Sequence, residues 1–424
     1  MRDAAATTKG RAPGLFPASA SPEAGLLLAS RALRAFGDGL VSLLLPAYLA
    51  GRGFGAFEVG LIATATLAGS SALTLLVGLH AHRLSGRGPL LGAALLMTLT
   101  GVAFALAEGF RPLLLIALVG TLNPSAGDVS LFLPLEQARL ARAVADRDRT
   151  ALFARYSLVG SLAGAVGALC AGFPEVLGGL LPGGLEPALR AAFLLYAALG
   201  QASLLLYRRL PVEAPEARAP AGPLRRSRRV VLTLAALFSL DAFAGGLVVQ
   251  SLLALWLLER FGLSLAATGA IFFWTGLLSA LSQLAAAPVA RRFGLVNTMV
   301  FTHLPANVCL MLVPFAPGLG PAVALLLARS ALSQMDVPTR TSYVMAVVEP
   351  AERAAAASVT AVPRGLAAAA GPLLAGSLLA VSGFGWPLVV GGGLKIAYDL
   401  ALLAMFRNVR PPEEDADRAR RPAG

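Results

Sequence analysis

The stretch PAVALLLARSALSQMDVPTRTSYVMAVV, residues 321–348, decides the fold class. It is long and apolar enough to cross a bilayer, whose hydrocarbon core of about 30 Å needs about 20 apolar residues per helix. Inside it, Asp336 and Arg340 lie one helical turn apart, with Pro338 between them. Because a charge in contact with lipid costs about 3 kcal/mol or more, this stretch predicts a membrane helix whose charged face is turned towards protein or water.

The rest of the chain has the same apolar character. Its 424 residues are 57% hydrophobic and 14% charged, with a mean hydropathy of +0.73, whereas soluble domains are about 25% charged. Apolar runs separated by Gly, Pro and charge clusters predict an all-α integral membrane protein with twelve transmembrane helices. The predicted spans are 25–50, 55–79, 89–108, 112–136, 150–172, 188–207, 230–258, 265–290, 295–316, 321–347, 356–380 and 387–406.

Basic residues are divided unequally between the predicted loops. With the N-terminus inside, 24 of the 35 arginines and lysines lie on the cytoplasmic side, 3 lie outside and 8 lie within spans. This asymmetry predicts that both termini are cytoplasmic. It also explains the net charge of +12 by loops that face anionic lipid, so no nucleic-acid partner is expected. No cleaved signal peptide is expected, and the expected location is the bacterial inner membrane.

A polar connection divides the predicted spans into two groups of six. Residues 208–229, RRLPVEAPEARAPAGPLRRSRR, are rich in Pro and Arg and lack apolar periodicity, which predicts a flexible cytoplasmic linker. The linker separates an N-terminal bundle, 25–207, from a C-terminal bundle, 230–406. Cytoplasmic tails, 1–24 and 407–424, complete the chain.

The two halves resemble each other at a spacing of about 205–209 residues. Four segments match in the same order, which predicts a parallel repeat with a pseudo-two-fold axis along the membrane normal. The matched residues are Gly60 with Gly269, Arg83 with Arg292, Asp128 with Asp336, Gly167 with Gly371, and Gly172 with Gly376.

The most specific motif lies between the second and third spans, in GLHAHRLSGRG, 78–88, and a degraded copy, ARRFG, occupies 290–294. The sequence resembles the major facilitator superfamily of secondary transporters, whose loop pattern is roughly G-x-x-x-D-R-x-G-R. Here one extra residue precedes the second glycine, and His82 occupies the acidic position. The resemblance implies the fold of that superfamily, two pseudo-symmetric six-helix bundles. It also implies a gating loop that comprises Gly78, Arg83, Gly86, Arg87 and Arg292.

Nine charges lie deep within the predicted spans: Arg34, Asp38, Asp128, Asp241, Asp336, Arg340, Arg364, Lys395 and Asp399. Three pairs of opposite sign have i,i+4 spacing and are predicted to neutralise each other; they are Arg34/Asp38, Asp336/Arg340 and Lys395/Asp399. The resemblance implies that helices 1, 4, 7 and 10 line a central path, with 5 and 11 beside them. Because seven of the nine charges fall on these helices, we expect them to face an aqueous cavity between the halves. Glu136 and Arg155 are expected in salt bridges near the cytoplasmic ends.

These features predict a secondary transporter that moves a small organic solute by alternating access. The candidates for proton coupling are Asp38, Asp128 and Asp336, because a nearby arginine that moves can load or release a proton. The candidates for substrate binding are Arg34, Asn123, Asp241, Gln250, Trp274, Arg340, Tyr343 and Arg364. Several of these, such as Trp274 and Tyr343, have packing as the alternative interpretation.

Other functions are less well supported. Neither of the two lysines, Lys9 and Lys395, lies in a G-x-x-x-x-G-K-[ST] motif, which argues against an ATP-driven pump. The three histidines lack carboxylate-rich loops, which argues against a membrane enzyme. His80 and His82 lack an accompanying Cys or carboxylate cluster, so we expect no metal and no cofactor.

The expected partners are a small-molecule substrate, protons and membrane lipid, and the chain is expected to be a monomer. The resemblance favours efflux. Uptake or exchange of an organic anion stays open as an alternative, as does a non-transporting membrane scaffold or receptor.

Overall fold

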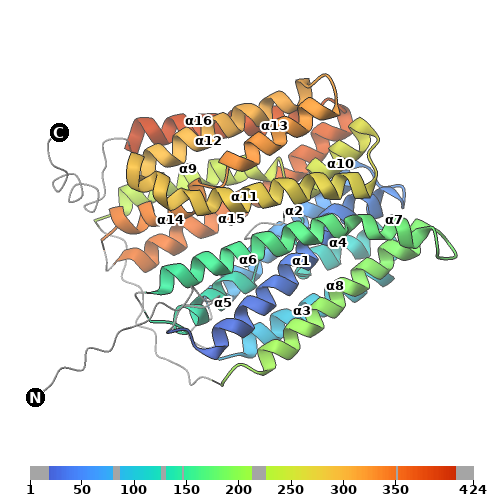
Figure 1. Cartoon of the computed structure of the whole chain (residues 1–424), viewed down its shortest axis with the longest axis horizontal. Helices are drawn as coiled ribbons and strands as arrows, with labels where there is room; N and C mark the ends of the chain where they lie inside the picture. The colour runs from blue at the N-terminus through green and yellow to red at the C-terminus, as the bar shows by residue number, and fades with distance from the viewer. Residues whose placement is uncertain are drawn as a thin grey trace, which may run out of the picture.

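The computed structural model describes residues 19–79, 86–125, 130–145, 148–212, 226–349 and 352–406. Within these residues the regular structure is helical (Figure 1). The helices of the N-terminal half lie in the lower part of the view, and those of the C-terminal half lie above them.

Among the described residues, the N-terminal half contains eight α-helices. They are α1 (Pro22–Ala50), α2 (Ala56–Leu79), α3 (Gly88–Leu106), α4 (Phe110–Val119), α5 (Phe132–Leu140), α6 (Arg149–Leu169), α7 (Phe173–Gly178) and α8 (Leu185–Arg208), and the short 3-10 helix η2 (Cys170–Gly172) joins α6 to α7.

The described part of the C-terminal half also contains eight α-helices. They are α9 (Arg228–Gly246), α10 (Gln250–Phe261), α11 (Leu265–Phe293), α12 (Leu295–Leu312), α13 (Leu319–Leu332), α14 (Asp336–Val347), α15 (Arg353–Val381) and α16 (Trp386–Phe406), and the 3-10 helix η3 (Val313–Phe315) follows α12.

Three predicted spans are each divided into two shorter helices. The span 112–136 becomes α4 and α5, the span 230–258 becomes α9 and α10, and the span 321–347 becomes α13 and α14. Proline explains part of this, because it lacks a backbone N–H and weakens a helix beyond its first turn: Pro124 lies between α4 and α5, and Pro338 is the third residue of α14. Pro46 lies inside α1 without dividing it, so a proline alone does not decide a break. Among the described residues, ten helical segments are long and apolar enough to cross a membrane, so the count of twelve spans stays a prediction.

Glycines that match in the sequence repeat occupy equivalent helix crossings. Gly60 of α2 meets Gly376 of α15, where a Cβ on Gly60 would lie 2.9 Å from the Gly376 Cα. In the counterpart crossing, a Cβ on Gly269 of α11 would lie 2.5 Å from the carbonyl oxygen of Ala168 in α6, and one on Gly172 would lie 2.8 Å from the Cα of Ala266. Only a residue without a side chain allows such close approach of backbones. Both crossings join the N-terminal half to the C-terminal half.

We call the end of the molecule where α1 and α9 begin the terminal end, and the opposite end, where α7 and α10 lie in Figure 1, the distal end. Both glycine crossings lie towards the distal end. There the carboxylate of Glu175 in α7 accepts hydrogen bonds from the backbone N–H groups of Leu265 (2.6 Å) and Ala266 (3.1 Å), at the start of α11. A carboxylate at a helix N-terminus satisfies free N–H groups and the helix dipole. This contact therefore links the two halves at the distal end.

Candidate functional site

A buried ionic cluster lies inside the N-terminal half. Arg34 of α1 forms an ion pair with Glu136 of α5, and the two side chains are 2% and 0% exposed. Tyr156 of α6 and Tyr207 of α8 both donate hydrogen bonds to Glu136, the latter across 2.6 Å. Four helices thus converge on one carboxylate, because a buried charge must be paired and hydrogen-bonded to be tolerated.

Aromatic rings surround the cations of this cluster. The guanidinium of Arg34 lies 4.1 Å from the ring centroid of Phe132, and that of Arg31 lies 5.2 Å from the ring of Tyr156. Both distances allow cation–π attraction. Arg31 is 7% exposed, so it belongs to the buried cluster.

Asp38, one turn beyond Arg34 on α1, faces the break between α4 and α5. Asn123 in this break and Tyr196 of α8 lie within hydrogen-bonding range of its carboxylate. The hydroxyl of Tyr196 also donates to the carbonyl of Thr121 across 3.0 Å. The broken helix therefore brings a polar side chain to a buried carboxylate.

A second ionic cluster lies inside the C-terminal half. Arg340 of α14 binds Asp336 of the same helix and Asp241 of α9, the latter across 2.9 Å. Lys395 of α16 donates to the other carboxylate oxygen of Asp241 across 2.6 Å. These four residues are between 3% and 8% exposed. Two anions and two cations balance, which makes their burial tolerable.

The two clusters are counterparts with reversed sign. In each half an ion pair joins the first helix to the helix that follows a break: Arg34 with Glu136, 102 residues apart, and Asp241 with Arg340, 99 residues apart. The cation lies on the first helix in the N-terminal half and on the later helix in the C-terminal half.

Next to the second cluster lies a buried histidine. The Nδ1 of His303 in α12 lies 2.9 Å from Oδ1 of Asp399 in α16, and the side-chain amide of Asn307 donates to Oδ2 of Asp399 across 3.0 Å. The three residues are 4%, 0% and 1% exposed, in the order His303, Asp399 and Asn307. The amide nitrogen of Asn307 also lies 3.2 Å from the same ring nitrogen.

The structure confirms one of the three predicted i,i+4 pairs, Asp336 with Arg340. The other two are wrong: Arg34 pairs with Glu136 instead of Asp38, and Lys395 pairs with Asp241 instead of Asp399. Sequence spacing identifies partners on the same helix, whereas these partners come from helices about 100 to 150 residues away.

The expected exposure to a wet cavity is also corrected. Asp336 and Arg340 are 3% and 7% exposed. Glu136 forms the expected salt bridge, with Arg34, but is fully buried. Because the charges neutralise one another, they do not need water in this state. These three side chains therefore face protein, as the cost of a charge in lipid requires.

The remaining candidates lie in different environments. Gln250 is the first residue of α10 and is half-buried, and Trp274 is 55% exposed and contacts Phe273 at 5.4 Å between ring centroids. Tyr343 is fully buried and packs edge-on against Phe406, which favours its packing interpretation. Arg364 is exposed in the middle of α15. Asp128 lies outside the described residues.

The predicted gating loop is described only in part, since Arg83 lies outside the described residues and Gly78 lies at the end of α2. The backbone of Gly86 has a positive φ of 77°. Arg87 donates to the carbonyls of Arg208 (2.5 Å) and Leu210 (3.1 Å), at the end of α8. Basic side chains are favourable at a helix C-terminus, so Arg87 ties the loop to its own half. Arg292, which the sequence repeat matches with Arg83, is exposed beside Phe293.

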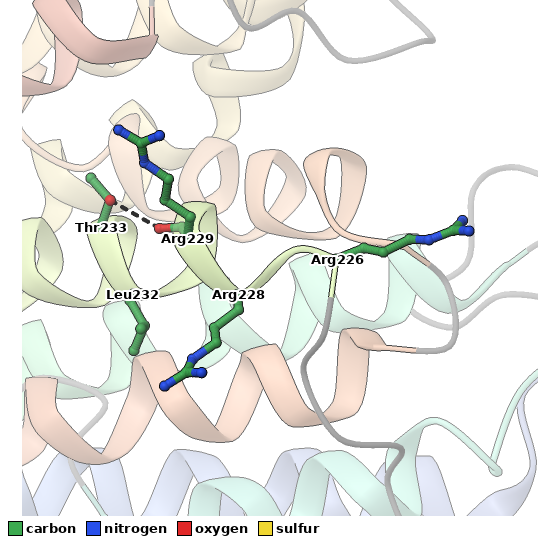
Figure 2. Close-up of a pocket in the computed structure, with 5 residues that line it drawn as sticks. All are labelled: Arg226, Arg228, Arg229, Leu232 and Thr233. Carbon is green, nitrogen blue, oxygen red and sulfur yellow. Dashed lines mark hydrogen bonds between the residues drawn. The ribbon is translucent and has the colours of Figure 1, made fainter.

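An open pocket at the start of α9 is lined by Arg226, Arg228, Arg229, Leu232 and Thr233. Figure 2 shows that its three guanidinium groups point in different directions. Arg226 is also paired with Glu349 at 3.1 Å. The pocket therefore lacks the convergent polar groups of a substrate site. In the described part of the chain, no three His, Cys, Asp or Glu side chains gather as a metal site requires.

Comparison with known proteins shows the family of this chain. The family model described as Major Facilitator Superfamily matches residues 27–334. The chain belongs to the Major Facilitator Superfamily, a superfamily of secondary transporters. Over 428 residues it is 27% identical to the uncharacterized membrane protein YJR124C of Saccharomyces cerevisiae, covering 92% of this chain and 95% of the yeast protein.

Solved structures of other superfamily transporters share the fold. A point mutant of the nucleoside transporter NupG has a TM-score of 0.72 and 16% identity, covering 91% of this chain and 100% of NupG. A D-xylose-proton symporter has a TM-score of 0.70 and 16% identity, covering 92% and 98%. The human organic anion transporter MFSD10 has a TM-score of 0.64 and 21% identity, covering 90% and 99%. At these identities the likeness concerns the fold alone.

Proposed function

We propose that this superfamily member is a proton-coupled secondary transporter that exports a small organic solute by alternating access. In this proposal the halves 25–207 and 230–406 rock against each other around the two ionic clusters. The observation that carries the proposal is the pair of reversed ion pairs, Arg34 with Glu136 and Asp241 with Arg340, on counterpart helices. A membrane scaffold has no need of them, because burying ion pairs is costly and contributes little stability.

The arrangement around Arg340 supplies a mechanism for coupling. Arg340 binds two carboxylates, Asp336 and Asp241, and Lys395 also binds Asp241. A proton on Asp336 removes one partner of Arg340, while Lys395 keeps Asp241 neutralised. Breaking an intact buried pair costs about 3–5 kcal/mol, so protonation lowers the barrier to moving Arg340. The freed guanidinium can then bind substrate or turn towards water.

In the N-terminal half we assign the corresponding role to Asp38. Arg34 is occupied by Glu136, whereas the carboxylate of Asp38 has the neutral groups of Asn123 and Tyr196 beside it and the charge of Arg31 nearby. Asn123 and Asp241 are then the nearest candidates for contacts with a substrate. The proposed location is a bacterial inner membrane with both termini in the cytoplasm, as the arginine distribution indicates.

The test is flux into or out of proteoliposomes that contain the purified chain, with and without an imposed pH gradient. The probes are uridine, D-xylose, p-aminohippurate as an organic anion and tetraphenylphosphonium as an organic cation. We expect one class to move against its concentration gradient when protons flow the other way. Absence of flux for every class in every gradient would support the scaffold alternative.

Uptake or exchange of an organic anion is the second candidate function. It is supported by Arg364, an arginine that lies exposed in the middle of α15. A thermal-shift measurement with the same four probes separates this candidate function from the first. Stabilisation by p-aminohippurate alone would favour uptake or exchange of an organic anion. This stabilisation should be lost in Arg364→Gln. It should be kept in the control Arg260→Gln, which alters an exposed arginine at the end of α10.

A further inference from the structure

The second cluster leaves one buried carboxylate without a permanent cation. Asp241 and Asp336 are balanced by Arg340 and Lys395. Asp399 is fully buried, and its hydrogen-bond partners are His303 and Asn307. An amide carries no charge, so His303 is the group that can neutralise Asp399.

We propose that His303 and Asp399 together form a proton-binding site inside the C-terminal half, and that this site holds one proton in the state described here. The proton rests either on the imidazole, giving an imidazolium–carboxylate pair, or on the carboxyl, giving a neutral pair. Because one hydrogen bond joins the two groups, the proton belongs to the pair. In both forms the pair as a whole is neutral.

Burial excludes the alternative of a neutral imidazole beside an ionised Asp399. That form would leave a net negative charge among residues that are at most 4% exposed, and a charge removed from water without a partner costs several kcal/mol. The contact of 2.9 Å between Nδ1 and Oδ1 places one hydrogen between the two atoms in every form, so the net charge of the pair is what separates the forms. Asn307 holds the other carboxylate oxygen and so fixes the orientation of the pair.

The charged and titratable groups around the pair come from several helices. The helix α9 contributes Asp241, α14 contributes Asp336 and Arg340, and α16 contributes Lys395 and Tyr398. The helix α13 carries Arg329, which is half-buried. Arg292 of α11 and Arg364 of α15 are exposed. None of these cations binds Asp399 among the contacts of the described residues.

The site is connected to the central cluster through α16, which carries both Lys395 and Asp399. Lys395 lies one helical turn from Asp399 and so shares a helix face with it. When the pair loses its proton, it gains a net negative charge that attracts Lys395 away from Asp241. Asp241 then depends on Arg340 alone. The pair can thus adjust the central cluster through the helix that the two share.

Histidine-selective ¹⁵N NMR of the full chain in lipid bilayers tests the proposal directly. The chain has three histidines, and subtracting the spectrum of His303→Gln from that of the wild type leaves the signals of His303. At pH 7 we expect either two protonated ring nitrogens or a single proton on Nε2 with Nδ1 accepting from Asp399. A proton on Nδ1 alone would mean that Asp399 is ionised and unneutralised, which overturns the proposal.

Thermal melting as a function of pH provides a second readout. A proton bound in the folded chain is lost as the pH rises, so the wild type should lose stability with rising pH. In Asp399→Asn this pH-dependent loss should shrink, since no buried charge is left to neutralise. His303→Gln should lower the melting temperature, and the double variant with Asp399→Asn should recover most of it.

Asn307→Leu is the control for a merely structural role. It removes a hydrogen bond without removing a titratable group, so it should lower the melting temperature at all pH values and keep the dependence on pH. Equal pH dependence in the wild type and in Asp399→Asn would contradict the proposal. The proposal goes beyond the transport function and does not rest on it, because both measurements read protonation in the absence of flux.

Discussion

Lys395 of α16 donates to the carboxylate of Asp241 in α9 across 2.6 Å, and this contact completes a buried chain of four alternating charges. The chain runs from Asp336 through Arg340 and Asp241 to Lys395. In the proposed mechanism Arg340 can leave Asp241 without stranding a charge, because Asp241 has Lys395 as a second cation.

Replacing Lys395 by Met should therefore impair transport and stability together. Asp241 and Asp336 would then share Arg340, so the cluster would need a bound proton to stay neutral, and the melting temperature should fall as the pH rises. Lys395→Arg, which keeps the charge, is the matched control. Melting curves between pH 5 and pH 9 check the prediction. A melting temperature of Lys395→Met that does not change with pH would count against the described charge balance.

The tyrosines around Glu136 should differ from Tyr398. Tyr156→Phe and Tyr207→Phe each remove a hydrogen bond to a buried carboxylate, which is worth about 1.5–3 kcal/mol. The hydroxyl of Tyr398 is buried with no hydrogen-bond partner among the described residues, so Tyr398→Phe should be neutral or slightly stabilising. Equal losses in chemical unfolding for all three would show that ring packing, and not the hydrogen bonds to Glu136, sets the effect.

Gly60→Ala should weaken the distal contact between the halves. The added Cβ would lie 2.9 Å from the Cα of Gly376, and backbone has to move to accept it. Gly92→Ala is the control, because a Cβ there meets nothing within 4 Å. Spin labels at Arg111→Cys and Arg260→Cys, in a chain without Cys170 and Cys309, measure the distance across the distal end. It should lengthen in Gly60→Ala and stay unchanged in Gly92→Ala.

Glu175→Gln should also weaken the contact between the halves at the distal end, because Glu175 binds the start of α11. The amide keeps one acceptor for the N–H groups of Leu265 and Ala266 but loses the negative charge that favours a helix N-terminus, a contribution of about 0.3–1 kcal/mol. The same spin-label pair should show a larger distal-open population. The control is Glu186→Gln, at an exposed site within the N-terminal half, which should leave the distribution of spin-label distances unchanged. An unchanged distribution in Glu175→Gln would show that the contact of Glu175 with α11 does not hold the halves together.

Much of the fold follows from the sequence because hydrophobic length and the repeat are local signals. Gly60, Gly172, Gly269 and Gly376 match by spacing alone, and the structure places them in equivalent crossings. Divided helices are less visible in the sequence, although Pro124 and Pro338 mark two of the three breaks.

The candidate site is only half visible from the sequence. The pair Asp336 with Arg340 can be seen because it lies on one helix. Glu136 cannot, because its position near the end of a predicted span hides its contact with Arg34 on another helix. Tyrosines in apolar runs, such as Tyr207, are the available signal, since a buried hydroxyl normally finds a partner.

The measurement that tests the central claim most directly compares the wild type with Asp336→Asn in the same proteoliposomes, using the probe that the flux assay identifies. Proton-driven accumulation and gradient-free exchange are recorded side by side. The neutral amide mimics a permanently protonated Asp336, so accumulation should be lost while exchange continues. Proton-driven accumulation at the wild-type level in Asp336→Asn would contradict the account.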